Sequence, residues 1–260
     1  MYDKRNDIGG NIMTYEEKLQ QYKDWIFRRS AYQMALAIIG IDKQTVAPSA
    51  GAAYRDERSA YLAGELFSIE TDPSMIQLLK ELKDDPQIDG DNKRAVELYY
   101  KQAMDTMCIP KDEFVAYQKL RDESFDAWIK AKSQSDYSIF EPYLKKIIEV
   151  SKKMYRYRNS DKNLYDQMLD DYEPGMTQEK YDVFFAALKE RLVPLIQKVT
   201  QAKQKNEEFL HQEFPVEDQK KFMTQLLEYL HFDSSWGYQN ESEHPFTSWT
   251  CENDCRTTTK

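Results

Sequence analysis

The stretch TQEKYDVFFAALKERLVPLIQKVTQAKQK, residues 177–205, decides the fold class. Thr177 stands where a helix cap is expected, and Pro194 is expected to kink the helix that follows. The apolar side chains recur at intervals of three and four residues, as one face of an α-helix requires. They are Tyr181, Phe184, Leu188, Leu192, Leu195 and Val199. The stretch therefore predicts a long amphipathic helix.

The same helical spacing extends over most of the chain before this stretch and a short way after it. Only 8 of the 260 residues are Gly, which also favours helices over a strand-and-turn fold. The residues from 39 to 51, IGIDKQTVAPSAG, are expected to form a loop. The predicted helices cover about residues 14–39, 52–68, 73–82, 91–107, 110–132 and 137–157, a short segment of the connector after residue 157, and residues 215–230.

After Leu230 the helical spacing stops. Residues 231–260, HFDSSWGYQNESEHPFTSWTCENDCRTTTK, carry Thr and aromatic residues in short runs between turn-forming residues. This pattern predicts two or three short antiparallel strands. We therefore expect a mainly α, multi-helix domain with a small antiparallel β-sheet or hairpin near the C-terminus. In this prediction residues 1–12 are a flexible extension, residues 13–230 are helical, and residues 231–260 are the strand region of the same domain.

Composition and charge argue against several functional classes. The net charge is −9, and phosphate backbones are bound by clustered Lys and Arg, so we expect no nucleic-acid partner. No apolar run approaches the length of a membrane span, and the opening MYDKRNDIGGNIM has no apolar signal-peptide core. Three Cys do not make a disulfide framework. We expect a cytoplasmic protein with no membrane partner.

Four short motifs follow one another along the chain. They are Asp42-Lys-Gln-Thr45 with the nearby Pro48 and Gly51, then Tyr172-Glu-Pro-Gly-Met176, then His244-Pro-Phe246, and last Asp254-Cys-Arg-Thr-Thr258. In this order and spacing they resemble the carboxypeptidase Taq family of zinc metallocarboxypeptidases, from about residue 13 to the end of the chain. The first match is partial, because Ile41 stands where the family has Trp.

The resemblance implies a largely helical fold around a deep groove, with a small sheet beside the active site. It implies an enzyme, commonly a homodimer, that removes C-terminal residues from peptide substrates. In the family, zinc or another divalent metal is held by His-Glu-x-x-His and a later Glu, which follow the last motif. The only histidines here are His211, His231 and His244, and no two are four residues apart.

We therefore expect an N-terminal part of such an enzyme, truncated before the zinc-binding helix. No metal is expected to bind this chain, and the chain alone is expected to be inactive. The alternative is a non-catalytic helical module from a truncated gene, serving peptide binding or interaction. An in-frame His-Glu-x-x-His beyond Lys260 would favour the enzyme, and an immediate stop would favour the module.

The resemblance also singles out five residues as substrate-binding or groove-lining. Arg256 is suited to bind a substrate carboxylate through two parallel hydrogen bonds, or else it pairs with Asp254 and holds the strand. His244 is a hydrogen-bond donor to the peptide or to the developing oxyanion, a group that orients a zinc ligand, or a structural histidine at a strand end. We expect it to face the groove from a strand adjacent to that of Arg256. Phe246 follows His244 in its motif, and Asp42 borders the groove in the family.

Cys251 and Cys255 form the one pair of nearby thiols. A metal site there would need further ligands, of which His244 is the obvious candidate. The simpler interpretation, which we favour, is two unrelated thiols on a small sheet.

Overall fold

The computed structural model describes residues 13–158, 160–203, 205–251 and 254–259. The predicted extension, residues 1–12, lies outside the described residues. The helices of the described part are α1 (Tyr15–Thr45), α2 (Ala52–Glu70), α3 (Pro73–Asp84), α4 (Gly90–Met107), α5 (Lys111–Gln134), α6 (Glu141–Tyr157), α7 (Leu164–Tyr172), α8 (Gln178–Gln201) and α9 (Val216–Tyr229). Short 3₁₀ turns lie at Ser49–Gly51, Tyr137–Ile139 and Glu208–His211.

Three strands follow the helices, β1 (Gly237–Glu241), β2 (Thr247–Cys251) and β3 (Asp254–Thr259). Every strand of the described residues lies after Leu230, as the change of sequence pattern predicts. The prediction of a mainly α domain with a small C-terminal sheet is therefore confirmed.

The start of α1 is fixed by local sequence. The Thr14 hydroxyl accepts a hydrogen bond from the Glu17 backbone N–H at 3.2 Å, and the Glu17 carboxylate accepts one from the Thr14 N–H at 2.8 Å. This reciprocal pair satisfies two backbone donors that the first helical turn leaves without a partner.

The end of α1 is not where the sequence places it. The helix continues to Thr45, so the prediction of a loop over residues 39–51 is wrong for its first half, and Asp42 lies on the helix. The physical reason is a non-local contact. The Lys43 ammonium is nearly buried and contacts Asp56 of α2 at 2.9 Å and Asp126 of α5 at 3.2 Å. These ion pairs hold the last turn of α1 against two other helices, and tertiary contacts of this kind override local propensity.

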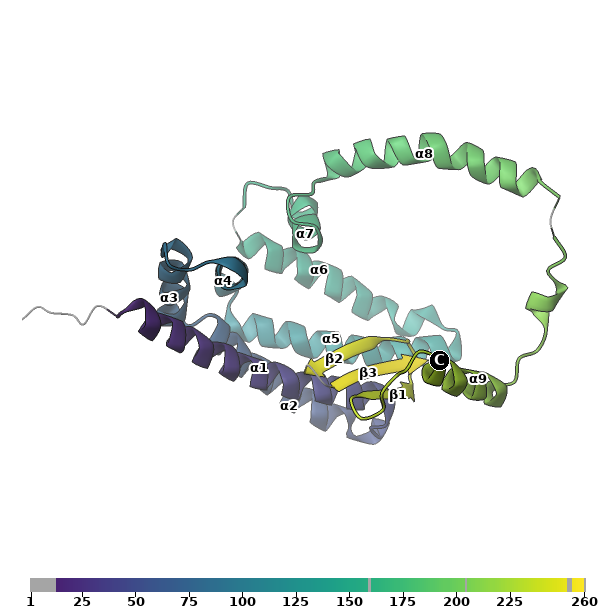
Figure 1. The fold of residues 1–260 in the computed structure, drawn as a ribbon, viewed down its shortest axis with the longest axis horizontal. Coiled ribbons are helices and arrows are strands. Elements are labelled where there is room, and N and C mark those ends of the chain that lie inside the picture. The colour runs from purple at the N-terminus through teal and green to yellow at the C-terminus, as the bar shows by residue number, and fades with distance from the viewer. Residues whose placement is uncertain (1–12, 159, 204, 252–253, 260) are drawn as a thin grey trace, which may run out of the picture.

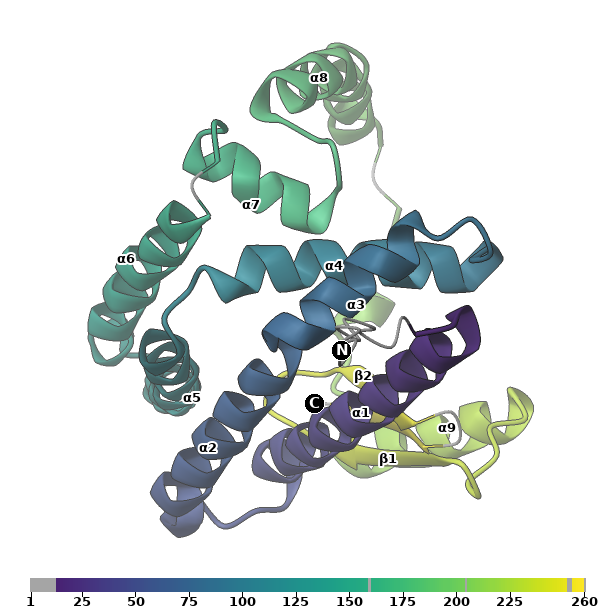
Figure 2. The same cartoon turned by 90° about the vertical axis from the view of Figure 1, so that its left-hand side faces the viewer.

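The hydrophobic core lies where α1, α3 and α4 meet. Leu79, Leu82 and Val96 are fully buried there. Trp25 of α1 packs on the same cluster, and its indole N–H donates to the carbonyl of Ile69 at 2.9 Å. In Figure 2, α1 and α2 lie side by side and α5 lies on the other side of α2. The sheet contacts this helical layer through α1 and β2.

The sheet has the strand order β1-β3-β2. The β2–β3 pair is antiparallel, as expected, with Ser248 opposite Arg256. The β1–β3 pair is parallel, with Tyr238 opposite Arg256, so the prediction of an entirely antiparallel sheet is wrong. The reason is topological. The chain reverses after β1 and again after β2, and β3 then enters the gap between them in the direction of β1.

Figure 1 shows the strands beside α1, with α9 next to β1, and α8 extending from α7 away from the other helices. Within the described ranges, no helix combines the length and the apolar character that crossing a membrane requires.

Candidate functional site

Arg256 lies in β3 and is held by its neighbour on the same strand. Its guanidinium donates to both carboxylate oxygens of Asp254, through Nε to Oδ1 and through Nη2 to Oδ2, the latter at 2.8 Å. The Thr250 hydroxyl donates a further hydrogen bond to Asp254 at 2.6 Å. These contacts, first that of Arg256 and then that of Thr250, lower the pKa of Asp254 to about 2. Asp254 is therefore a carboxylate at physiological pH and fixes the plane of the guanidinium.

A pocket of about 200 Å³ lies between the end of α1 and the sheet, and Arg256 is part of its wall. The guanidinium carbon lies 5.8 Å from the centre of the Tyr238 ring, which lines the same pocket. The other lining residues are Ile38, Ile41, Asp42, Thr45, Val46 and Asn240. Of the five candidate residues, the structure brings Asp42 and Arg256 together here. Ile41, at the position where the family has Trp, belongs to the same wall.

His244 lies elsewhere, in the loop between β1 and β2. It is exposed, and its Nδ1 lies 3.0 Å from the carbonyl oxygen of Pro245. The expectation that His244 occupies a strand adjacent to that of Arg256 is wrong, because this loop must first reverse the chain before β2 begins. His244 is also not among the residues that line the Arg256 pocket.

Two residues of α5 anchor the His244 loop. The Lys132 ammonium donates to the backbone carbonyl of Glu243 at 2.9 Å and forms an ion pair with its carboxylate at 3.0 Å. The Trp128 ring lies 6.3 Å from the His244 ring, and Lys132 lies 5.0 Å from the same indole. Sequence reasoning missed both residues. The one available signal was their spacing of four, which places an aromatic ring and a cation on one helix face.

Phe246 joins this loop to the central strand. Its N–H donates to the Thr258 hydroxyl at 2.9 Å, and its carbonyl accepts from the Thr258 N–H at 2.8 Å. The Ser242 hydroxyl donates to the same Thr258 oxygen at 2.6 Å. Phe246 is half-buried and does not line the Arg256 pocket. Its backbone therefore fixes where the His244 loop ends.

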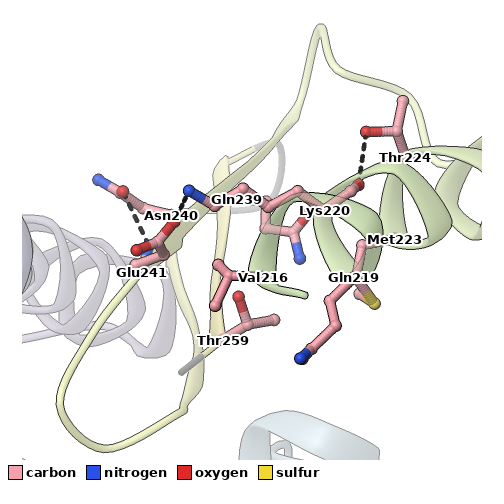
Figure 3. Close-up of a pocket in the computed structure, with 9 residues that line it drawn as sticks. All are labelled: Val216, Gln219, Lys220, Met223, Thr224, Gln239, Asn240, Glu241 and Thr259. Atoms are coloured by element: carbon pink, nitrogen blue, oxygen red, sulfur yellow. Dashed lines mark hydrogen bonds and ion pairs between the residues drawn. The ribbon is translucent and has the colours of Figure 1, made fainter. Parts of the chain in front are cut away.

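A larger pocket of about 500 Å³ lies between α9 and β1 (Figure 3). The Lys220–Glu241 ion pair, at 2.8 Å, joins the two elements across it. Asn240 lines both this pocket and the Arg256 pocket, which places the two next to each other along β1. None of the five candidate residues lines this larger pocket.

The motif Tyr172-Glu-Pro-Gly-Met176 forms the turn between α7 and α8. Gly175 has φ +87°, a conformation in which a side chain is strained, and its N–H donates to the Asp170 carboxylate at 2.9 Å. The motif shapes a turn in this structure, and none of its residues lines the Arg256 pocket.

The described residues do not fit a zinc site. No group of three His, Cys, Asp or Glu side chains among them is arranged to hold a metal ion. Cys255 is a buried free thiol, whereas the side chain of Cys251 lies outside the described part of the chain. A metal that acts beside this sheet would need ligands from elsewhere.

Known proteins resemble this chain along nearly all of its length. The sequence profile of the Carboxypeptidase Taq (M32) metallopeptidase family matches residues 21–260. Carboxypeptidase 1 of Bacillus subtilis is 36% identical over 253 residues, which are 96% of this chain and 50% of that protein. Thermostable carboxypeptidase 1 of Thermus thermophilus is 30% identical over 247 residues, which are 90% of this chain and 48% of that protein.

Solved structures of carboxypeptidases also resemble this chain along nearly all of its length. The crystal structure of BsuCP superposes with a TM-score of 0.88 at 34% identity and covers 94% of this chain and 49% of that one. The M32 carboxypeptidase from Deinococcus radiodurans R1 has a TM-score of 0.77 at 25% identity, with coverages of 94% and 49%. This chain thus spans about half the length of the curated relatives that it matches. With both its motifs and its fold accounted for, the chain belongs to the carboxypeptidase Taq (M32) metallopeptidase family.

Proposed function

We propose that this chain forms the substrate-side wall of a zinc-dependent metallocarboxypeptidase that removes C-terminal residues from peptides. One observation carries the proposal: Arg256 and Asp42, from opposite ends of the chain, line the same small pocket. A carboxypeptidase must recognise a free α-carboxylate, and a guanidinium held in a fixed plane is the side chain best suited to do so.

In this proposal the carboxylate of the last peptide residue binds Arg256 from the side of the pocket. Asp254 holds the guanidinium from within the strand, so less side-chain entropy is lost when the substrate binds. Ile38 and Ile41 form an apolar wall for the side chain of the last residue. Asp42 accepts a hydrogen bond from the last amide N–H of the peptide.

His244 and Phe246 contribute to the groove from the neighbouring loop. His244 donates a hydrogen bond near the scissile carbonyl, where negative charge develops during hydrolysis. The contacts of Lys132 and Trp128 with this loop support the role, because a donor is effective only when its position is fixed before the reaction.

The metal chemistry belongs to the part of the enzyme that this chain does not span. In a metallopeptidase of this kind, a divalent metal polarises the carbonyl and activates water. We propose that zinc fills this role, that the 260-residue chain alone holds no zinc and hydrolyses no peptide, and that the whole enzyme is a cytoplasmic homodimer. The absence of His-Glu-x-x-His from the sequence supports the lack of zinc and of activity, and the low number of cysteines supports a cytoplasmic location. The homodimer is what the family resemblance implies.

Carboxylate recognition can be tested on the chain itself, without metal. We would titrate it with a short peptide bearing a free C-terminal carboxylate and with the same peptide amidated at that end. The free acid should bind more tightly, and the Arg256→Ala variant should lose the difference. Arg94→Ala, which removes an exposed arginine of α4, is the matched control and should keep it. Equal binding of the two peptides by the unaltered chain would contradict the proposal.

A further inference from the structure

The α8 helix is the least covered long element of the described chain. None of its residues is buried. Phe184, Phe185, Leu188, Leu192, Leu195 and Ile196 each expose between 40% and 56% of their surface. An exposed apolar surface of this extent is unusual in a monomeric protein and marks an interaction site.

These side chains form one continuous stripe. Together with Tyr181 they recur at three and four residues, and we call this set the α8 stripe. At its beginning the Tyr181 and Phe185 rings stack with centroids 5.7 Å apart, and the Phe184 ring meets Phe185 edge-on at 5.3 Å. The stripe is thus an ordered apolar face that the other described elements leave largely exposed.

Two hydrogen bonds join the start of α8 to the segment that precedes it. The Gln178 N–H donates to the Asp166 carboxylate of α7 at 2.7 Å, and the Lys180 ammonium donates to the Gly175 carbonyl at 2.5 Å. Figure 1 shows the remaining turns of α8 well away from the helical layer. Helices in proteins owe most of their stability to the packing of an apolar face, so we expect another protein surface to pack on the apolar face of α8.

We propose that the α8 stripe is the docking surface for the half of a carboxypeptidase Taq family enzyme that this chain does not span. The relatives match this chain over 90–96% of its length, yet the match takes up only 48–50% of theirs. A second body of equal size therefore accompanies this fold in the family. The stripe is the apolar face that such a body requires in order to pack.

The charges on α8 favour a protein partner over a membrane or a nucleic acid. Helices that lie on membranes carry mainly Lys and Arg on the polar face. Here both signs are interspersed, with Glu179, Asp182 and Glu190 beside Lys180, Lys189, Arg191 and Lys198. A polar face with both signs is typical of a helix seated on another folded surface, with its charges in water.

The test uses the half of Bacillus subtilis carboxypeptidase 1 that this chain does not match, prepared as a separate polypeptide. Added to the 260-residue chain, it should form a one-to-one complex and slow hydrogen exchange over residues 181–196. Leu188→Glu places a carboxylate in the stripe and should weaken this complex at least tenfold. Gln197→Glu adds the same charge on the opposite face of α8 and should leave it unchanged. Both positions are exposed, so neither substitution disturbs the core.

A second measurement covers the case in which the separate polypeptide does not fold. The two halves are joined in one chain, and hydrogen exchange of α8 is compared between this fusion and the 260-residue chain. Protection of residues 181–196 in the fusion, lost with Leu188→Glu, supports the proposal. Unchanged exchange in the fusion overturns it. The proposal is also overturned if dimerisation of the 260-residue chain, or its binding to anionic lipid vesicles, protects the stripe from hydrogen exchange as strongly as the fusion does. Peptidase activity is not the readout, so a failure here is distinct from a failure of the Arg256 role.

Discussion

Arg256 of β3 and Asp42 of α1 line the same pocket, although nearly the whole chain separates them in sequence. Asp42 occupies the last turn of a helix whose end is held by the Lys43 ion pairs, and Arg256 occupies the central strand of the sheet. Both side chains are thus carried by regular elements, which place groups more accurately than loops do.

Replacing Arg256 should impair substrate capture in the assembled enzyme that we propose. Arg256→Ala removes charge-assisted hydrogen bonds, each worth about 1.5–3 kcal/mol. That corresponds to a loss in kcat/KM of roughly ten- to more than a hundredfold. Arg256→Lys should recover only part of this, because an ammonium cannot make the planar double contact.

Steady-state kinetics with a peptide substrate measures this effect, with the zinc content of each variant determined in parallel. Wild-type kcat/KM in a folded, metallated Arg256→Ala variant would show that the guanidinium does not bind substrate. Loss of zinc or of the fold would instead assign Arg256 a structural role as the partner of Asp254.

The 260-residue chain should retain no zinc. The sequence has no His-Glu-x-x-His, and the described residues offer no cluster of three ligands. Metal analysis after dialysis against a mild chelator is the measurement, with a peptidase assay on the same sample. About one zinc per chain after dialysis would contradict the expectation, and Cys251, Cys255 and His244 would then be the first residues to replace.

Removing the Lys132 side chain should loosen the His244 loop while leaving the rest of the fold intact. Lys132 and Glu243 are partly exposed, and such ion pairs contribute only about 0–1 kcal/mol to global stability. Lys132→Ala should therefore leave the thermal midpoint almost unchanged but speed hydrogen exchange over residues 242–246. Lys130→Ala, on the same helix, is the control. Equal exchange in both variants would show that Lys132 does not position the loop.

Replacing Asp122 of α5 should stabilise the protein at neutral pH. Burial raises the pKa of this carboxyl above its ordinary value of 3.8, although the nearby Lys43 ammonium partly offsets the rise. The folded state therefore binds this proton more readily than the unfolded state, so ionisation at higher pH works against folding. Asp122→Asn should therefore increase the free energy of unfolding at pH values above the raised pKa. It should leave that free energy unchanged at pH values below 3.8, where the carboxyl is protonated in both states.

Urea unfolding of both proteins, from pH values below 3.8 up to neutral pH, measures the free energy of unfolding. Glu123→Gln, at the next position of α5 where the carboxylate is exposed, is the matched control and should show little change at any pH. A gain from Asp122→Asn that persists at low pH would have a cause other than the charge.

Asp254 should titrate at about 2, far below an ordinary aspartate, because Arg256 and Thr250 donate to its charged form. The depressed pKa means that its contribution to stability is fully present above the ordinary value of 3.8 and is lost as the pH falls toward 2. Carboxyl-carbon NMR of the folded chain gives the value directly. In Arg256→Ala the pKa should return toward 3.8, and an unchanged low value would mean that the guanidinium is not its cause.

The sequence predicted most helices well, because their caps and apolar spacing are local signals. Its main error was the end of α1. Gly40 and Thr45 are poor helix formers, and the contact that overrides them joins Lys43 to side chains on two other helices. Local periodicity contains no information about such a contact, so the placement of Asp42 on a helix could not be predicted.

The candidate site was predicted in part. The motifs led to Arg256 and Asp42, and the alternative that Arg256 pairs with Asp254 is a contact in the structure. Trp128 and Lys132 were missed because they lie on a helix far from any motif, and their contact with the His244 loop depends on tertiary packing. The parallel pairing of β1 was missed because strand direction within a sheet follows from topology, whereas side-chain alternation is the same in either direction.

The central position of β3 determines the order in which this region can be assembled during synthesis. β1 and β2 leave the ribosome first, but in this strand order neither has the other as a neighbour. Both strands can therefore pair only after residues 254–259 have been made. The first hydrogen bonds between strands form with the same segment that carries Arg256. Deleting β3 would therefore remove all pairing among these three strands. During synthesis, the nascent chain exposes β1 and β2 unpaired until β3 has been made, and exposed strand edges of this kind make a nascent chain prone to aggregation and dependent on chaperones.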